Sequence, residues 1–460
     1  MSGDRAQIDI TSLAEKVTGP VLTPGRKGYE EELTGFQAGY RHDPAVVVGA
    51  ATAEDVRAAV AWAAERGLPV TAQSTGHGIT VLDRGGLVIT TGRLDGITVD
   101  PAARTARIGA GARWEQVVAR TAPHGLAPLS GSAGHVGVVG YTLAGGLGLL
   151  AREFGYAADL VRSLDVVTAD GRLRTVTADS DPDLFWALRG GRDNFGLVTA
   201  LEIDLLPVAR VYGGGLYFDA GRAAEVLAHF KSWTATAPET VTASVGMIEY
   251  PPIPVFPEPL RGRHVVHVRL ATTDLAAGPE LARPWREFGV EVLHDHLGEM
   301  DFTEVGSIYA EPDFSHAYDG NAVLLSELDD TVLEAVRTLA GPGAPVPCIV
   351  DLRHLGGALS REPRVPNAVP YREAGYILRV LSGSDDAPAG AIRAAHAALD
   401  EAVRPWTLGR SLNFVYGERS ADDFADELYD PATRARLARL KAVYDPGNLF
   451  RSNLNIAPAA

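Results

Sequence analysis

The alternation of apolar and polar positions divides the chain into a first part with short, closely spaced elements and a middle part with longer ones. Residues 46–48 are three consecutive valines, which predict a short buried strand. Thr52 and Asp55 have the spacing of a capping box, so a helix is predicted to start there and to end at Gly67. Val70 begins the next strand, and this stretch of about 30 residues therefore predicts a βαβ unit.

Further short elements are predicted up to about residue 208. Strands are expected at 87–90, 97–99, 104–108 and 201–205, and helices at 113–122 and from Asp181 onwards. Two apolar runs at 164–168 and 173–176 flank Asp170-Gly171, a dipeptide that favours a type I′ turn, so they predict a hairpin.

The middle of the chain, from about residue 212 to 419, has longer elements without strict alternation. Helices are predicted at 220–236, 281–288, 326–339 (with Ser326 as N-cap) and 387–402, and strands at 242–248, 264–270, 347–354, 376–381 and 411–416. This arrangement predicts an α+β domain with an antiparallel sheet. A last helix is expected from Asp430-Pro431 to residue 443.

Composition and charge narrow the function classes. The 460 residues carry a formal net charge of −16, which disfavours nucleic acid and anionic membrane surfaces as partners. Segment 1–7 is polar and has no apolar signal core, and no stretch reaches the roughly 20 apolar residues of a membrane span, so a cytoplasmic protein is expected. Cys348 is the only cysteine, which excludes an intramolecular disulfide. No metal site is predicted, because His294 and His296, the nearest approach to ligand spacing, fit a solvated loop better.

The first candidate site is a lone histidine between glycines. Gln73, Ser74, Thr75, Gly76, His77 and Gly78 follow the second strand of the βαβ unit. Glycines on both sides of His77 let a bulky partner approach the backbone closely. The alternative is an ordinary strand-to-turn connection with an exposed histidine.

The second candidate site is residues 131–148, which contain seven glycines in eighteen residues. Because each glycine costs about 0.5–1 kcal/mol inside a helix or strand, an irregular loop is predicted. Its backbone N–H groups would suit a flat, anionic ligand. The stretch does not fit a dinucleotide-binding Rossmann fingerprint or a Walker loop, and a loop built only for packing is the alternative.

Four motifs together resemble the FAD-linked oxidases related to berberine bridge enzyme, which have the vanillyl-alcohol oxidase fold with a PCMH-type FAD-binding domain. They are the His77 loop, the runs Val-Gly-Val-Val-Gly-Tyr at 136–141 and Gly-Gly-Arg-Asp-Asn-Phe-Gly-Leu-Val-Thr at 190–199, and the tail 444–456. The resemblance covers nearly the whole chain. It implies an FAD-binding domain formed by residues 1–208 and 420–460, and an α+β substrate domain, 209–419, over the flavin ring.

The resemblance also implies the residues that hold FAD. His77 matches the histidine that is bonded to the flavin, and an imidazole nitrogen is a suitable nucleophile for that bond. The other cofactor-binding residues implied are Gln73, Ser74, Thr75, Gly76, Gly78, Gly131, Ser132, Gly134, Val136, Gly137, Tyr141, Gly145, Gly146, Gly148, Asn194, Gly196, Val198, Asn453 and Asn455.

Departures from the family pattern refine this expectation. Many relatives have a cysteine where this chain has Ala133, so only one covalent attachment is expected. Relatives that oxidise sugars or aromatic alcohols usually have tyrosines where this chain has Leu147 and Phe414, which favours oxidation of a C–N or allylic C–H bond in a secondary metabolite. Val136 stands where a small residue leaves room for dioxygen.

On the substrate side, Arg353 and His354 end a predicted strand before a pair of glycines, and Asn413 and Tyr416 lie on a later strand. For Arg353 and His354 the alternative is an ion pair at a sheet edge with Asp351 or a nearby acid. The sequence predicts an FAD-dependent oxidase that takes hydride from a small organic substrate and passes electrons to O2, giving H2O2. The alternatives are a flavin dehydrogenase with another electron acceptor and a carrier that binds an aromatic ligand without redox turnover. The sequence does not indicate the oligomeric state.

Overall fold

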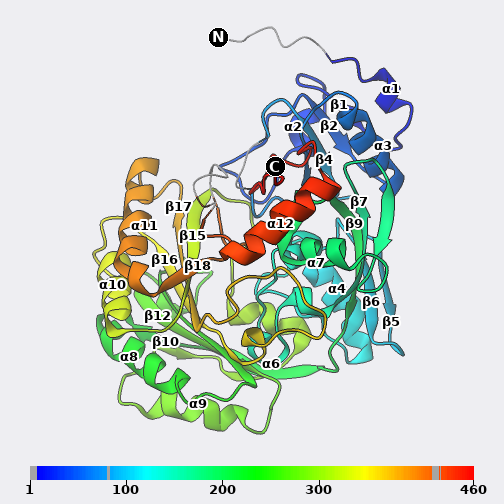
Figure 1. Ribbon diagram of the computed structural model, residues 1–460. Coiled ribbons are helices and arrows are strands. Elements are labelled where there is room, and N and C mark those ends of the chain that lie inside the picture. Colours follow the sequence, from blue (N-terminus) through cyan, green and yellow to red (C-terminus); the bar gives the residue numbers. More distant parts are fainter. Residues whose placement is uncertain (1–7, 80–82, 417–423, 425) are drawn as a thin grey trace.

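The computed structural model describes residues 8–79, 83–416, 424 and 426–460. The chain forms two small sheets from its first part and one large sheet from its middle part, and the C-terminal helix lies back over the first part (Figure 1). The predicted polar N-terminal segment 1–7 and the predicted boundary at residues 419 and 420 lie outside the described residues.

The four-stranded sheet contains the βαβ unit. Its order is β1 (Val21–Leu22), β2 (Val46–Gly49), β4 (Leu87–Thr90) and β3 (Val70–Gln73), with the last three strands parallel. The crossover helix α3 (Ala53–Ala64) is capped by Thr52, which accepts the N–H of Asp55 at 3.1 Å. The predicted unit is thus present, but β4 lies between its two strands. Two short helices, α1 (Thr11–Ala14) and α2 (Tyr29–Glu32), precede it.

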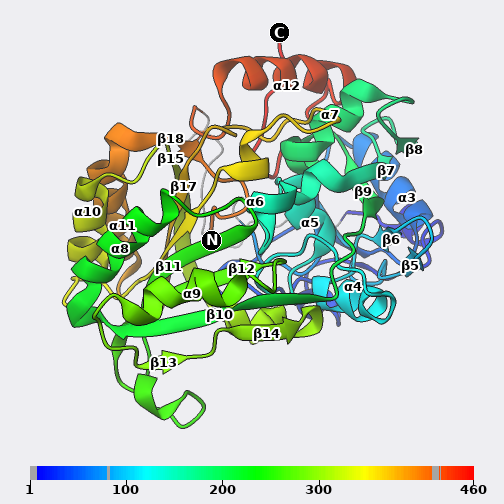
Figure 2. The same cartoon turned by 90° about the horizontal axis from the view of Figure 1, so that it is seen from below.

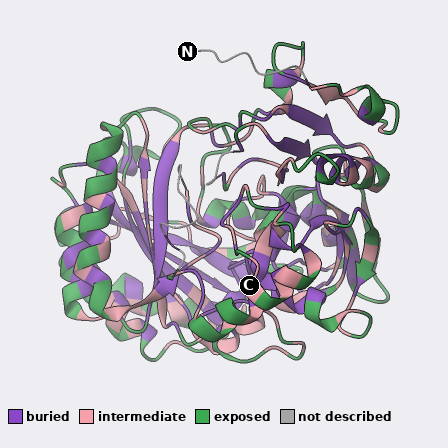
Figure 3. Cartoon of the chain, turned by 45° about the horizontal axis from the view of Figure 1, so that its top comes forward, coloured by how far each residue is buried: buried purple, intermediate pink, exposed green. Residues whose placement is uncertain are grey.

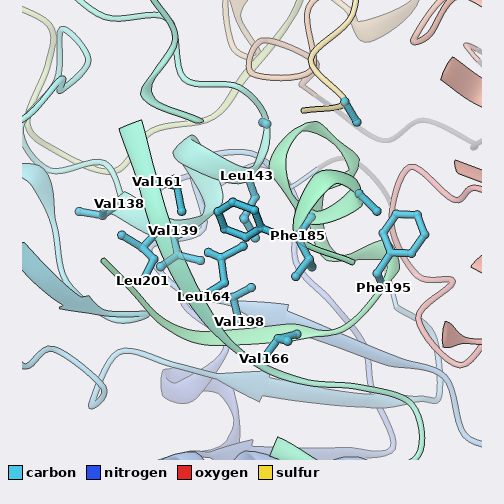
Figure 4. Close-up of a cluster of buried hydrophobic side chains, with 14 of the residues drawn as sticks. Val138, Val139, Leu143, Val161, Leu164, Val166, Phe185, Phe195, Val198 and Leu201 are labelled. Atoms are coloured by element: carbon cyan, nitrogen blue, oxygen red, sulfur yellow. The ribbon is translucent and has the colours of Figure 1, made fainter. Parts of the chain in front are cut away.

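The five-stranded antiparallel sheet has the order β5 (Ile97–Asp100), β6 (Thr105–Gly109), β9 (Leu197–Asp204), β7 (Val161–Val167) and β8 (Leu173–Val176). The β7–β8 pair is the predicted hairpin. Around this sheet lie α4 (Trp114–Thr121), α5 (Val138–Leu143), α6 (Ala151–Phe154) and α7 (Pro182–Gly191). Apolar side chains of α5, α7, β7 and β9 meet in the core of this part (Figure 4).

The nine-stranded sheet is antiparallel throughout. Its order is β13 (His294–Asp295), β10 (Arg210–Asp219), β12 (His264–Thr272), β11 (Val241–Glu249), β16 (Ile349–His354), β17 (Tyr376–Gly383), β15 (Tyr318–Leu325) and β18 (Thr407–Arg410), and β14 (Gly298–Asp301) also pairs with β10. Helices α8 (Ala223–Thr234), α9 (Gly278–Glu287), α10 (Asp330–Ala340) and α11 (Ala389–Val403) pack on one face (Figures 1 and 2). Their outer surfaces are exposed while the strands beneath are buried (Figure 3). The opposite face is therefore the one that meets the first part of the chain.

Several sequence predictions are wrong in detail. The glycine-rich stretch is not irregular throughout, because Val138, Val139 and Leu143 bury one side of the short helix α5 in the core. Residues 411–415 form turns instead of the predicted strand, and only an isolated bridge joins Tyr416 to Gly320. Helix α10 begins after Asp329, whose carboxylate accepts the N–H of Thr331 at 2.8 Å, and not at Ser326. Strand β10 was missed because three consecutive glycines, residues 213–215, indicate a loop.

The C-terminal helix α12 (Pro431–Tyr444) fastens the tail to the first part. The buried Lys441 ammonium lies 2.7 Å from Asp445 Oδ2 and donates to the carbonyls of Asn194 and Phe450 at 2.6 and 2.9 Å. Asp445 in turn accepts the N–H groups of Leu449 and Phe450. We propose the domain division 1–208, 209–419 and 420–460 on this basis.

Candidate active site

The His77 loop leaves the carboxyl end of β3. Gly76 has φ +70°, and a Cβ there would lie 2.7 Å from Gly35 Cα, so the loop requires glycine at this position. Thr75 Oγ1 lies 2.7 Å from His77 Nδ1, and Tyr318 of β15 donates its hydroxyl to the His77 carbonyl at 2.8 Å. The ring is thus held from within the loop and the backbone from the middle part of the chain.

The imidazole of His77 is stacked in a group of aromatic rings. Its centroid lies 4.0 Å from that of Phe36 and 4.9 Å from that of His135, with interplanar angles of 13° and 25°. Burial, with smaller contributions from the neighbouring His135 and Arg113, lowers the pKa of His77 to about 3. The ring is therefore neutral near pH 7, which keeps a nitrogen lone pair available.

Gly137 joins the glycine-rich stretch to the His77 loop. Its N–H donates to Thr75 Oγ1 at 3.3 Å, and a Cβ at this position would lie 3.1 Å from Ser74 Oγ and 3.3 Å from Thr75 Oγ1. Val136, one residue earlier, is partly buried, and its carbonyl accepts the N–H of Trp114 at 3.1 Å. The two predicted sites therefore form one structure.

Several other glycines make room for Tyr141. A Cβ at Gly131 or Gly146 would lie 2.9 or 2.6 Å from its ring, and one at Gly148 would lie 3.3 Å from its hydroxyl. Asn413 spans this stretch: its Oδ1 accepts the N–H of Gly146 and its Nδ2 donates to the Tyr141 carbonyl, both at 2.9 Å. Asn413 thus shapes the glycine-rich stretch by using both atoms of its amide to hold the backbone.

Arg353 and His354 point to opposite faces of the large sheet, as adjacent residues on a strand must. Arg353 Nε lies 2.6 Å from Asp351 Oδ2, on the face towards the His77 loop. The Nε2 atom of His354 instead accepts from Arg152 at 2.8 Å, and its ring stacks on Tyr376. The structure therefore brings Arg353 to the site and leaves His354 outside it. The ion pair with Asp351 was an alternative in the sequence analysis, although β16 is a central strand and not an edge.

Tyr416 lies within the site. Its ring packs edge to face on Tyr318, with centroids 5.2 Å apart. Since Tyr318 contacts the His77 backbone, Tyr416 is one ring away from the histidine.

Some of the remaining predicted residues bond or pack within the protein, and others have a polar atom without a partner. Asn194 uses both amide atoms, donating to the Gly191 and Leu454 carbonyls and accepting the N–H of Ile456. Val198 is buried in the core, and Gly196 has φ +156°, close to extended. Within the described residues, Asn453 Oδ1 and Asn455 Oδ1 are buried without a hydrogen-bond partner.

The site fits a large polar ligand that has both donors and acceptors. Among the residues that the structure describes, Gln73 Oε1, Ser74 Oγ, His77 Nε2 and Tyr141 OH are buried and also lack hydrogen-bond partners. Buried polar atoms are nearly always hydrogen-bonded, so a cluster of exceptions indicates a binding site. A Cβ at Gly78 or Gly140 would meet no heavy atom of the described chain within 4 Å, so there is room beside both loops.

Sequence reasoning missed four contributors: Phe36, His135, Tyr318 and Glu311. Glu311 accepts the Ser132 hydroxyl at 3.0 Å and so joins the glycine-rich stretch to the middle part of the chain. His135 is the one histidine of the predicted loop 131–148, and this was a signal that could have been used. The other three have no motif around them.

Within the described parts of the chain, no group of three histidine, cysteine or carboxylate side chains is placed to hold a metal ion. No described helix is both long and apolar enough to cross a membrane.

Comparisons with known proteins agree with this geometry. An FAD-binding domain family matches residues 44–177, and a family described as berberine and berberine-like matches residues 409–457. The (R)-6-hydroxynicotine oxidase of Paenarthrobacter nicotinovorans is 27% identical over 96% of this chain and 97% of its own. Among solved structures, xylooligosaccharide oxidase from Myceliophthora thermophila has a TM-score of 0.85 at 21% identity, covering 98% of this chain and all of its own. The glucooligosaccharide oxidase of Acremonium strictum, whose structure is described as revealing a novel flavinylation, has a TM-score of 0.84 at 18% identity, covering 98% and 99% of the two chains.

The fold and the site define a flavoprotein oxidoreductase with a PCMH-type FAD-binding domain. The combination of an FAD-binding domain with a berberine-like domain, and relatives that align over nearly the whole chain, indicate the FAD-linked oxidases related to berberine bridge enzyme. The sequence-based predictions of the α+β fold, of the family and of an FAD-dependent oxidase are thereby confirmed.

Proposed function

We propose that the protein binds FAD covalently through His77 and through no other residue. The observation that carries this proposal is the pairing of His77 Nδ1 with Thr75 Oγ1 while Nε2 has no partner among the described residues. A threonine oxygen has two lone pairs, so besides the N–H of Gly137 it can accept an Nδ1–H of the imidazole, and we assign His77 this tautomer as part of the proposal. The lone pair is then on Nε2, which is the nucleophilic nitrogen in this tautomer.

A second covalent bond to the flavin would need a cysteine thiol beside the cofactor, and this chain does not supply one. Ala133 occupies the position of the second attachment site in the family resemblance. Cys348, the only cysteine of the chain, packs beside the core under α10, and its Sγ lies 3.8 Å from the Ala340 carbonyl. Burial raises the pKa of that thiol to about 11, so it is protonated and unreactive near pH 7.

The His77 loop and the glycine-rich stretch would hold the dinucleotide by their backbone N–H groups. The unpaired side-chain oxygens of Gln73 and Ser74 would add further contacts. Bound FAD would accept a hydride equivalent from the substrate and return electrons to dioxygen, giving H2O2. Val136 supports the use of dioxygen, because its small side chain stands where the family resemblance implies an oxygen path. A dehydrogenase that uses another electron acceptor would not form H2O2, and neither would a carrier without redox turnover.

For the substrate we propose a small organic molecule, such as a secondary metabolite, oxidised at a C–N or allylic C–H bond. Leu147 and Phe414 have no phenol that could remove a proton from an alcohol, and both pack in an apolar cluster with Leu324 and Ile377. The nicotine oxidase that matches over nearly the full length acts on an amine. Fast reduction of the flavin by a hexose or an oligosaccharide would contradict this substrate class.

The test is acid precipitation of the purified protein followed by mass spectrometry of its peptides. We expect the yellow colour to stay in the pellet and one flavin adduct on the peptide that contains His77. His77→Ala should fold, since a loop imidazole adds little to the core, but should release its flavin in acid. Complete release of flavin from the wild-type protein, or an adduct elsewhere, would refute the attachment. Peroxide formation in air by substrate-reduced enzyme tests the oxidase assignment separately.

A further inference from the structure

Three arginines lie side by side on the face of the large sheet that meets the His77 loop. Arg269 on β12 and Arg353 on β16 are both cross-strand partners of Ser244 on β11, and Arg379 on β17 is the partner of Asp351. Gly246 permits this arrangement, because a Cβ there would lie 3.0 Å from Arg269 Nη1. The sheet register therefore places three guanidinium groups within one patch.

The acids in this patch do not balance the arginines. Asp351 pairs with Arg269 at 3.0 Å and with Arg353 at 2.6 Å. Among the residues that the structure describes, the ion-pair partner of Arg379 is Glu311, with 3.7 Å between Nη1 and Oε1. Burial alone would raise the pKa of Asp351, but Arg353 and Arg269 outweigh it and hold that pKa below its usual value, so the carboxylate is ionised. Three positive and two negative groups leave a surplus of one positive charge.

Each arginine also keeps an unused donor. Within the described chain, Arg269 Nε, Arg353 Nη2 and Arg379 Nε are buried and have no hydrogen-bond partner. The side chains of Arg269 and Arg353 are only 8% and 6% exposed, so bulk water does not satisfy them. A buried guanidinium with an unsatisfied N–H is costly unless an acceptor binds there.

Two aromatic rings contact the guanidinium groups. The guanidinium carbons of Arg269 and Arg353 lie 4.4 and 4.6 Å from the ring centroid of Tyr309, and those of Arg353 and Arg379 lie 5.1 and 5.3 Å from that of Phe414. Such a patch suits a planar anion, which can both accept from the arginines and lie against the rings.

The patch adjoins the proposed flavin site. Glu311, the partner of Arg379, accepts from Ser132 of the glycine-rich stretch. Arg353 also lies close enough to Tyr141 to affect that phenol electrostatically. A ligand held by Arg353 and Arg379 would therefore lie beside the two loops that are proposed to hold the cofactor.

We propose that this patch receives the carboxylate of the substrate, so that the enzyme oxidises a small planar or aromatic organic acid anion; this inference rests on the proposed function. Arginine binds carboxylates through two parallel N–H groups, and Arg353 and Arg379 supply donors at neighbouring positions on adjacent strands. Leu147 and the other apolar residues around Phe414 would face the uncharged part of the molecule.

The test compares sodium benzoate with benzamide, a neutral molecule of nearly the same shape, by isothermal titration calorimetry on the oxidised holoprotein. We expect benzoate to bind at least about tenfold more tightly than benzamide, the usual effect of a charge-assisted hydrogen bond. Arg379→Gln should remove most of that preference and leave benzamide binding within about twofold. This variant is chosen because Glu311 keeps its hydrogen bond from Ser132 when Arg379 is lost.

The matched control is Arg361→Gln, which removes an exposed arginine paired with Glu239 and should leave both affinities unchanged. Equal binding of benzoate and benzamide, or no binding of either, to the wild-type protein would overturn the proposal. A benzoate preference that Arg379→Gln leaves intact would overturn it as well. Calorimetry needs no turnover, so it tests the arginine patch separately from the flavin attachment. If acid releases the flavin but the protein still prefers benzoate, the His77 attachment is refuted and the carboxylate patch is not.

Discussion

Lys441→Met should loosen the C-terminal tail from the rest of the molecule. The lysine is fully buried, and its ammonium makes the three contacts that join α12, the Asn194 turn and the segment around Phe450. Methionine matches the length of the lysine stem but cannot donate. The substitution therefore leaves the Asp445 carboxylate buried without its cation.

The loss of unfolding free energy in Lys441→Met depends on the hydrogen bonds that Asp445 keeps. Removing one partner of a buried ion pair costs about 3–5 kcal/mol, most of it from the charge left behind. Asp445 still accepts the N–H groups of Leu449 and Phe450 at 2.7 and 2.9 Å, so the lower end, about 3 kcal/mol, is expected. Adding Asp445→Asn to the variant removes the isolated charge but leaves one oxygen for the two N–H groups that the carboxylate accepts, so the double variant should be at least as stable as Lys441→Met alone.

The assay is urea unfolding followed by tryptophan fluorescence, together with hydrogen exchange of the Leu449 and Phe450 amides. The matched control is Arg436→Met on the same helix, whose 2.9 Å ion pair with Asp183 is 42% exposed on the arginine side and worth about 0–1 kcal/mol. The reasoning fails if Lys441→Met is as stable as the control, or if the double variant is less stable than Lys441→Met alone.

Three further predictions concern the site and the sheet. Val136→Leu should slow the reoxidation in air of dithionite-reduced protein, followed by stopped-flow absorbance; an unchanged rate would show that oxygen does not pass this side chain. Gly137→Ala should lower the ratio of flavin to protein absorbance, because the new Cβ lies 3.1 Å from Ser74 Oγ, whereas full flavin content would mean that the two loops can move apart. Burial and the neighbouring Arg152 lower the pKa of His354 to about 3, so between pH 6.5 and 3 the unfolded state binds a proton that the folded state does not, and stability falls as the pH falls. His354→Gln should therefore reduce the slope of unfolding free energy against pH between 6 and 4 by up to about 1.4 kcal/mol per pH unit, and an unaltered slope would show that His354 is protonated in the fold.

Local physical chemistry explains which features the sequence predicted well. The β7–β8 hairpin depends on Asp170-Gly171, and Gly171 has φ +70°, a conformation that this dipeptide favours. The caps of α7 and α12 are the side chains of Asp181 and Asp430, each of which accepts backbone N–H groups within three residues. His77 was proposed as a candidate for the same reason, since its flanking glycines are visible in the sequence.

The site, in contrast, depends on which residues the packing of three sheets brings together. The sequence analysis placed Arg353 and His354 together at the site, but adjacent residues of a strand point to opposite faces, and only the tertiary structure decides which face meets the His77 loop. Asn413 was predicted on a strand as a candidate for chemistry, whereas in the structure it lies in a turn and bonds Gly146 and Tyr141. Nothing local distinguishes these outcomes.

The same holds for the glycine-rich stretch and for the ring that holds His77. Glycine frequency predicted an irregular loop, yet Val138 and Val139 gain more by burial in the core, and so a short helix forms. Tyr318, which contacts the His77 carbonyl, is 241 residues away in the chain. The sequence by itself therefore determined the β7–β8 turn and the caps of α3, α7 and α12, because these depend on residues within a few positions of one another. The tertiary structure alone decided the surroundings of that histidine and the arginine patch above it, because both are made by strands that meet only when the sheets pack.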